Sequence, residues 1–144
     1  MLRGRMFLDR DQFKPAAEMR LARDKTSIRV TITDQKACEF GEAVYAWITA
    51  DGKPVRIGTC GSSAGKRLLS YPGYINRSLA GRGGTTPKWE ALKWLGLLTA
   101  HGMLTAVVHQ PEPTLTATGL IRPYIEVERQ LIRRYRPLLN RNHR

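Results

Sequence analysis

The sequence is poor in cysteine and in long apolar stretches, and each shortage excludes a class of protein. Only Cys38 and Cys60 occur among 144 residues, too few for a disulfide scaffold or a cysteine-based zinc site. We therefore expect two buried free thiols and a reducing compartment, the cytoplasm. No apolar run approaches the roughly 20 residues that a membrane-spanning helix needs. Charged residues from Asp9 onward also leave no apolar signal segment.

Acidic residues are scarce as well. The chain has 12 Asp and Glu against 24 Lys and Arg, a formal net charge of +12. Such an excess needs an anionic partner, and with no membrane span the favoured partner is a phosphate backbone. The alternative is a basic protein without a nucleic-acid partner. The length fits one domain with a real core, and the 42% hydrophobic content is that of a folded protein.

The order of apolar patterns predicts an α+β fold with a small, mostly antiparallel three-stranded sheet flanked by helices. An extension, residues 1–40, precedes a main domain over residues 41–144. Within the extension we expect a helix over 12–23 and a strand over 27–33. The strands expected in the main domain cover 43–48, 54–58 and 104–109, and the first two are joined by a hairpin turn at Asp51-Gly52.

Helices and loops fill the rest of the main domain. We expect a small-residue loop over 59–65, a helix from about Lys66 and a loop over 82–84. A second helix begins near Pro87, with Thr86 as its cap, and ends at Gly102. A Pro- and Thr-rich loop is expected over 111–122. A last helix extends from near Pro123 to about Asn140, with Pro137 disrupting its final turn.

Four sequence blocks then occur in a recognisable order. Ala43-Val44-Tyr45 and Arg56-Ile57-Gly58 lie on the two hairpin strands. Lys66-Arg67-Leu68-Leu69-Ser70-Tyr71 follows, and Glu128-Arg129-Gln130-Leu131-Ile132 precedes Arg136-Pro137-Leu138-Leu139-Asn140. Together, over about residues 43 to 142, these blocks resemble the GIY-YIG endonucleases, whose name describes the two hairpin motifs. Three departures exist: Ala43 replaces the first Gly, Arg56 replaces the second Tyr, and the loop from Gly58 to Arg67 is one residue longer than the usual spacing.

The resemblance implies a divalent-metal-dependent DNA endonuclease that uses Mg²⁺ or Mn²⁺. In this reading Glu128 is the metal ligand, and Arg56 contacts the scissile phosphate in place of a tyrosine. The catalytic residues that the resemblance implies are Tyr45, Arg56, Arg67, Tyr71, Glu128 and Asn140.

The residue types suit phosphodiester hydrolysis. Arg67 carries a permanently charged planar fork that donates two hydrogen bonds to a phosphate. Mg²⁺ takes one or two carboxylates and keeps its waters, so a single Glu is sufficient. Tyr45 is a candidate to position or deprotonate the attacking water, and deprotonation requires nearby cations because a free phenol has a pKa near ~10. Structural alternatives exist: Tyr45 as core, Arg67 as a solvated charge, and Tyr71 as packing for the turn at Pro72-Gly73.

Glu126 is the rival of Glu128 for the metal-binding role. Helical spacing places Glu128 with Ile125, Leu131, Ile132 and Tyr135 on the core side, whereas Glu126 shares a face with Arg129, Gln130 and Arg133. A carboxylate on the buried side needs a metal or an Arg partner, so Glu128 is preferred. Trp89 and Trp94, on a Leu-rich helix, are expected to pack in the core.

The function predicted is a small restriction-type or structure-selective DNA endonuclease, with residues 1–40 supplying recognition or dimer contacts. One site cuts one strand, so a double-strand cut needs a homodimer or two successive events. One alternative is an inactive nucleic-acid-binding protein of the same fold, which the loss of the motif tyrosine at Arg56 favours. Another is an RNA-binding or ribosome-associated protein. Candidate backbone contacts are Lys66, Arg77, Arg82, Lys88, Arg133, Arg134 and the tail over 141–144.

Overall fold

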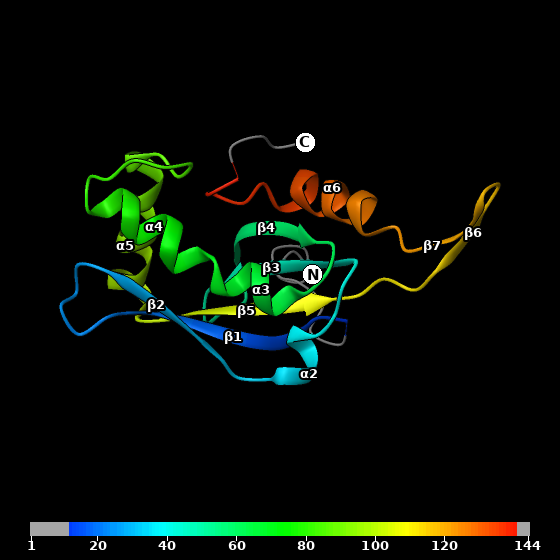
Figure 1. Ribbon diagram of the computed structural model, residues 1–144, viewed down its shortest axis with the longest axis horizontal. Coiled ribbons are helices and arrows are strands. Elements are labelled where there is room, and N and C mark those ends of the chain that lie inside the picture. Colours follow the sequence, from blue (N-terminus) through cyan, green and yellow to red (C-terminus); the bar gives the residue numbers. More distant parts are fainter. Residues whose placement is uncertain (1–11, 141–144) are drawn as a thin grey trace.

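The computed structural model describes residues 12–140, and its centre is a five-stranded antiparallel sheet with the strand order β2-β1-β5-β3-β4. Helices flank this sheet, so the predicted α+β class and antiparallel pairing are confirmed (Figure 1). The strands are β1 (Lys14–Leu21), β2 (Ile28–Ile32), β3 (Ala43–Ile48), β4 (Pro54–Cys60), β5 (Leu104–His109), β6 (Thr114–Thr116) and β7 (Gly119–Ile121). The helices are α2 (Gln35–Cys38), α3 (Ala64–Leu69), α4 (Tyr71–Leu79), α5 (Lys88–His101) and α6 (Tyr124–Tyr135).

The N-terminal part of the chain corrects two expectations. Residues 12–23 were expected to form a helix, but β1 lies there, and the central sheet has five strands rather than three. Strand β1 pairs with both β2 and β5, and these two ladders outweigh the helix propensity of its Ala, Glu, Met and Leu residues. Pro15, which cannot donate to a ladder, lies at the register shift between Pro15 and Ala17. Residues from the extension therefore build the same sheet as the main domain.

The sheet is covered on both faces, and β3 is buried along its whole length. One face carries Tyr45 and Trp47 and packs in the core cluster that includes residues of α3, α4 and α5. The other face carries Val44, Ala46 and Ile57, which pack with Ile132 of α6. Adjacent residues of one strand thus enter two separate cores, as the period of two requires.

The C-terminal segment differs in two ways from its expected form. The loop expected over 111–122 contains the β6–β7 hairpin, which projects from the body of the molecule (Figure 1). Helix α6 ends at Tyr135, and Arg136 then takes a left-handed conformation (φ 45°) before Pro137, which cannot continue the helix. The chain then reaches the edge of β4, where Leu139 N donates to Val55 O (2.8 Å).

Other expectations agree with the structure or need small corrections. Helix α5 occupies the predicted range, but its cap is Pro87 without a side-chain hydrogen bond, so Thr86 is not the cap. Both cysteines are buried free thiols, as expected. Within residues 12–140, no helix has the length and apolar character to cross a membrane.

Candidate active site

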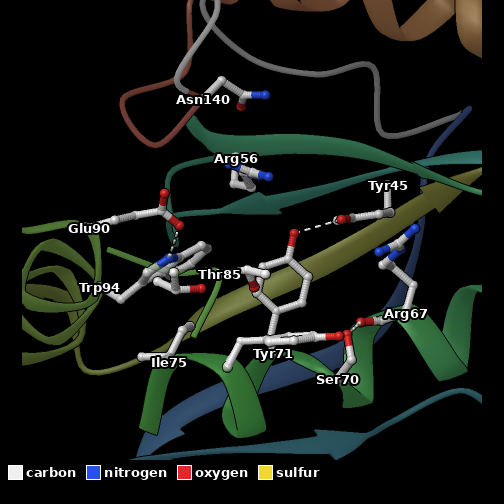
Figure 2. A pocket seen from close by; sticks show the side chains of 12 residues that line it. Tyr45, Arg56, Arg67, Ser70, Tyr71, Ile75, Thr85, Glu90, Trp94 and Asn140 are labelled. Carbon is white, nitrogen blue, oxygen red and sulfur yellow. Dashed lines mark hydrogen bonds between the residues drawn. The ribbon is translucent and has the colours of Figure 1, made fainter. Parts of the chain in front are cut away.

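A cavity of about 390 Å³ lies between the sheet and helices α3, α4 and α5 (Figure 2). Five of the six side chains expected to be catalytic line it, although they come from β3, β4, α3, α4 and the segment after α6. These five residues are Tyr45, Arg56, Arg67, Tyr71 and Asn140; the other lining residues are Ser70, Tyr74, Ile75, Thr85, Thr86, Glu90 and Trp94.

The β3–β4 ladder sets the back of the cavity. Tyr45 pairs with Gly58 and Trp47 pairs with Arg56, and residues paired across an antiparallel ladder lie on the same face. Position 58 must be a glycine because the Tyr45 ring lies directly over it and leaves no room for a side chain. A Cβ atom at Gly58 would overlap the hydroxyl oxygen and Cζ of Tyr45. The Ile-Gly pair therefore keeps a space on the sheet surface for one particular tyrosine.

The two tyrosines are joined directly. The hydroxyl groups of Tyr45 and Tyr71 lie 2.6 Å apart in a hydrogen bond, and their rings meet edge-on with centroids 6.0 Å apart (Figure 2). Tyr71 also contacts Trp47 and Trp94 edge-on, at 5.5 and 5.6 Å between centroids. Tyr71 thus belongs to an aromatic cluster at the base of the cavity, and the turn expected at Pro72-Gly73 is instead the first turn of helix α4.

The protonation state of Tyr45 follows from its burial. Burial raises the pKa of Tyr45 well above its usual value of 10, and the charge and hydrogen bond of Tyr71 raise it further. Arg56 and Arg67 lower this pKa, but their effects are the smaller ones. Without a bound ligand Tyr45 is therefore a neutral phenol at physiological pH. In this state it can position a water molecule or a phosphate oxygen, and it cannot serve as a base.

Arg56 and Asn140 lie side by side at the edge strand β4. Arg56 Nη1 donates to Leu139 O (2.7 Å). The Asn140 amide accepts from Ile57 N (2.8 Å) and donates to Ile57 O (2.9 Å), so it pairs with the free edge of β4 as a neighbouring strand would. Asn140 thus ties the segment after α6 to the site.

Arg56 remains charged despite its burial. Desolvation lowers the pKa of this guanidinium, but the negative charges that Tyr71, Tyr45 and Glu90 can carry raise it, and the net direction is upward. Its Nε atom is buried without a hydrogen-bond partner within residues 12–140. The cavity thus holds a fixed positive charge with an unused donor in a desolvated place, where charge interactions are strong.

Arg67 is the most accessible of these residues. It lies near the end of the short helix α3, which begins after Ser63, whose hydroxyl accepts from Lys66 N (3.4 Å). Ser70 Oγ donates to Arg67 O (2.6 Å) where α3 gives way to α4. The exposed guanidinium of Arg67 lines both the central cavity and a neighbouring one of about 240 Å³.

Glu128 is not among the residues that line the central cavity. It is half-buried on α6, and Val127, Leu131 and Ile132 of the same helix pack on the face of the sheet opposite Tyr45. Glu126 is exposed, as expected. Ile125 was expected to face the core with Glu128, but it is about half exposed.

Glu90 is the residue that the sequence analysis missed. Its side chain is only 5% exposed, lines the central cavity and accepts a hydrogen bond from the Trp94 indole (3.4 Å). One signal was available, because Glu90 shares the helical stripe of Trp94 and Leu98, both of which are buried. Trp94 is in the core as expected, whereas Trp89 is 49% exposed, so its expected core position is wrong.

The six basic residues expected to contact a phosphate backbone are all exposed. Lys66 lines the cavity beside Arg67, and Arg77 and Arg82 line a third cavity of about 570 Å³. Lys88 Nζ donates to Leu79 O (3.2 Å). Arg133 and Arg134 lie in the last turn of α6. The tail over 141–144 lies outside the described residues.

Comparison with known proteins yields fold similarity alone. No protein-family model and no curated protein sequence matches the chain. A mutant of bacteriophage T4 EndoII has a similar structure, with a TM-score of 0.57, 18% identity, and coverage of 89% of this chain and 91% of that one. Restriction endonuclease HPY188I in complex with product DNA superposes at a TM-score of 0.48 and 14% identity, over 78% of this chain and 64% of that one. The first similarity establishes a fold shared with a solved phage protein.

Proposed function

We propose that this protein is a DNA endonuclease of the GIY-YIG type that hydrolyses phosphodiester bonds with Mg²⁺ or Mn²⁺. The observation that carries the proposal is the convergence of Tyr45, Arg56, Arg67, Tyr71 and Asn140 on one cavity. These residues are separated by up to 95 positions, from 45 to 140, and all of them belong to the sequence blocks that resemble the GIY-YIG endonucleases. The fold shared with T4 EndoII supports the same class.

Each side chain has a task that its surroundings suit. In hydrolysis a bond forms between a water oxygen and phosphorus, one P–O ester bond breaks, and the departing oxygen takes up a proton. Arg67, accessible at the mouth of the cavity, is suited to bind the scissile phosphate with two donors. Arg56 adds a buried positive charge that stabilises the extra negative charge of the transition state. The neutral Tyr45 phenol, linked to Tyr71, orients the attacking water.

The proposed cation ligand is Glu128. Within the described part of the chain, no cluster of three or more His, Cys, Asp or Glu side chains is present. A cation at Glu128 would therefore complete its shell mainly with water, a hard-oxygen ligand that suits Mg²⁺ and Mn²⁺. When bound, the cation would neutralise phosphate charge and lower the pKa of a coordinated water.

DNA is the proposed partner, and the basic surface is proposed to hold it. Lys66 lies beside Arg67, and the other exposed basic residues extend the positive surface over α4, α5 and α6. Each neutralised phosphate makes affinity fall with added salt, so binding should weaken steeply between low and physiological ionic strength. The same proposal includes a restriction-type or structure-selective target and a cytoplasmic location. It also includes recognition or dimer contacts by residues 1–40, and a homodimer for double-strand cuts.

A cleavage assay on supercoiled plasmid and branched DNA tests the proposal. Wild type, Glu128→Ala and the matched control Glu126→Ala are compared with Mg²⁺, with Mn²⁺ and with EDTA. The two glutamates share α6 and differ in burial, so any general effect of losing one α6 carboxylate appears in both variants. We expect wild type and Glu126→Ala to cut only with the cation, and Glu128→Ala to be inactive.

The other outcomes are informative. If Glu126→Ala is inactive and Glu128→Ala cuts, the proposed nuclease activity is upheld but the cation ligand is Glu126. If none of the proteins cuts but all bind DNA equally, the protein is an inactive binding module. Preferential binding to RNA without cleavage would favour the ribosome-associated alternative.

A further inference from the structure

The buried acid Glu90 has no role in the reaction just described. It is 5% exposed on α5, and it lines the same cavity as Arg56, Tyr71 and Asn140. A buried carboxylate is costly unless it is compensated, and the indole of Trp94 at 3.4 Å supplies one neutral donor. The cavity also brings Glu90 close enough to Arg56 for the two charges to attract, which raises the pKa of Arg56.

Arg56 needs an orienting partner. Its Nη1 donates to Leu139 O (2.7 Å) and its side chain also interacts with Tyr71, whereas its Nε is buried without a partner within residues 12–140. The Nε edge of the planar guanidinium is therefore held by no hydrogen bond within residues 12–140. A negative charge in the same desolvated cavity favours one orientation of the guanidinium, because attraction between charges is strong where water is excluded.

We propose that Glu90 is a positioning residue that holds the Arg56 guanidinium against the cavity wall, in the orientation needed to meet a scissile phosphate. Figure 2 shows the Glu90 carboxylate and the Arg56 side chain on the same side of the cavity, below Asn140. Trp94 in turn fixes the Glu90 carboxylate through its indole N–H. A hydrogen bond thus links Trp94 in the core to Glu90, and the attraction between charges links Glu90 to Arg56 in the same cavity.

This role explains why a basic nuclease keeps an acid in its substrate cavity. A carboxylate repels phosphate, so Glu90 weakens the binding of DNA as such. Its benefit arises only if the orientation of Arg56 contributes to the transition state more than the lost attraction costs. The proposal therefore predicts opposite effects on binding and on turnover when the charge is removed.

The test uses Glu90→Gln, in which the amide oxygen can still accept from Trp94 and the size is unchanged. The matched control is Glu112→Gln, which removes the same charge at an exposed position. We expect DNA affinity of Glu90→Gln to equal or exceed that of wild type, while kcat falls on the order of 10- to 100-fold. In an Arg56→Gln background, adding Glu90→Gln should change kcat less than twofold, because no guanidinium remains to be positioned.

A second readout is independent of cleavage. The Nε–H resonance of Arg56 in a ¹⁵N NMR spectrum should shift and broaden in Glu90→Gln and stay unchanged in Glu112→Gln. The inference rests on the proposed function only for the measurement of kcat, because the resonance can be recorded without cleavage. If wild type does not cut DNA, the proposed function fails and the resonance still tests the positioning. If wild type cuts, and Glu90→Gln keeps both kcat and the resonance, Glu90 is an ordinary buried acid and the inference is wrong.

Discussion

The two faces of the central sheet are built from the same strands, yet they differ in composition. The face under α6 is apolar, with Val44, Ala46 and Ile57 packed against Ile132. The other face carries Tyr45, whose hydroxyl is hydrogen-bonded within the cavity, and Arg56, whose charge is buried there. Neighbouring residues of a strand point to opposite faces. Moving one position along the strand therefore leads from an apolar packing residue to a residue that faces the cavity.

The comparison indicates which face stabilises the fold and which face holds the candidate site. Burying apolar side chains stabilises the α6 face in proportion to the area removed from water. The cavity face instead contains the unpartnered Nε of Arg56 and the buried acid Glu90, both of which cost stability. Proteins commonly tolerate such costs only at functional sites. We therefore expect changes on the cavity face to affect turnover, and changes of the apolar side chains that pack between the sheet and α6 to affect stability alone.

The largest effect is expected from Arg67→Ala. The side chain is exposed and supports no core, so the unfolding free energy should change by less than about 0.5 kcal/mol. Loss of a preorganised donor to the transition state should lower kcat by a factor of roughly 100 to 1000. Single-turnover cleavage and urea unfolding measure the two quantities. Lys66→Ala, an exposed neighbour, should reduce binding and leave kcat near that of wild type; equal losses of kcat in both variants would contradict the assignment of Arg67.

Gly58→Ala should rank second, because the new methyl group overlaps the Tyr45 ring. We expect a loss of about 1–3 kcal/mol in unfolding free energy, typical of overpacking, and a loss of cleavage as Tyr45 leaves Tyr71. The control is Gly73→Ala on α4, where a methyl group meets no atom within 4 Å. This control should be neutral or stabilising by up to about 1 kcal/mol. If Gly58→Ala behaves like Gly73→Ala, the ring does not depend on the glycine.

The residues of the cavity face could be predicted from the sequence because they are distinguished by residue type. Tyr45, Arg56, Arg67, Tyr71 and Asn140 lie in four ordered blocks, and hairpin register, helix order and the return of the chain to β4 bring them together. The local patterns of β3, β4, β5 and α5 were also sufficient to place these elements, because the strands are apolar runs bounded by turn residues and α5 is bounded by Pro87 and Gly102.

Two features depended on distant contacts and could not be read locally. Strand β1 has the composition of a helix, and only its pairing with β2 and β5 makes it a strand. The helical stripe that Glu90 shares with Trp94 and Leu98 indicates burial, but only the packing of α5 places its carboxylate in the cavity that Arg56 also lines. In both cases tertiary structure overrides local preference.

A smaller effect is expected at alkaline pH, from the raised pKa of Tyr45. The folded state keeps the phenol neutral above the pH at which the unfolded chain loses this proton, near ~10. Stability from this group is therefore complete below about pH 10 and is lost as pH rises through the folded-state pKa. The unfolding free energy should therefore be lower at about pH 11 than at about pH 8. In Tyr45→Phe this part of the loss should vanish; urea unfolding at about pH 8 and pH 11 makes the comparison, and an identical alkaline loss in both proteins would mean that Tyr45 ionises freely.

The smallest effect compares one methyl group on each face. Ile132 of α6 is fully buried against the sheet, and Ile75 of α4 is equally buried but lines the cavity. Ile132→Val and Ile75→Val should each cost about 0.5–1.5 kcal/mol in unfolding free energy, because they remove the same group from a core. Their effects on cleavage should differ: Ile75→Val should lower kcat a few-fold, and Ile132→Val should leave it unchanged. A fall in kcat for Ile132→Val would contradict this prediction, and would mean that a small shift of α6 moves Glu128 enough to slow the reaction. The two faces would then be mechanically coupled through α6, and their division into packing and chemistry would be incomplete.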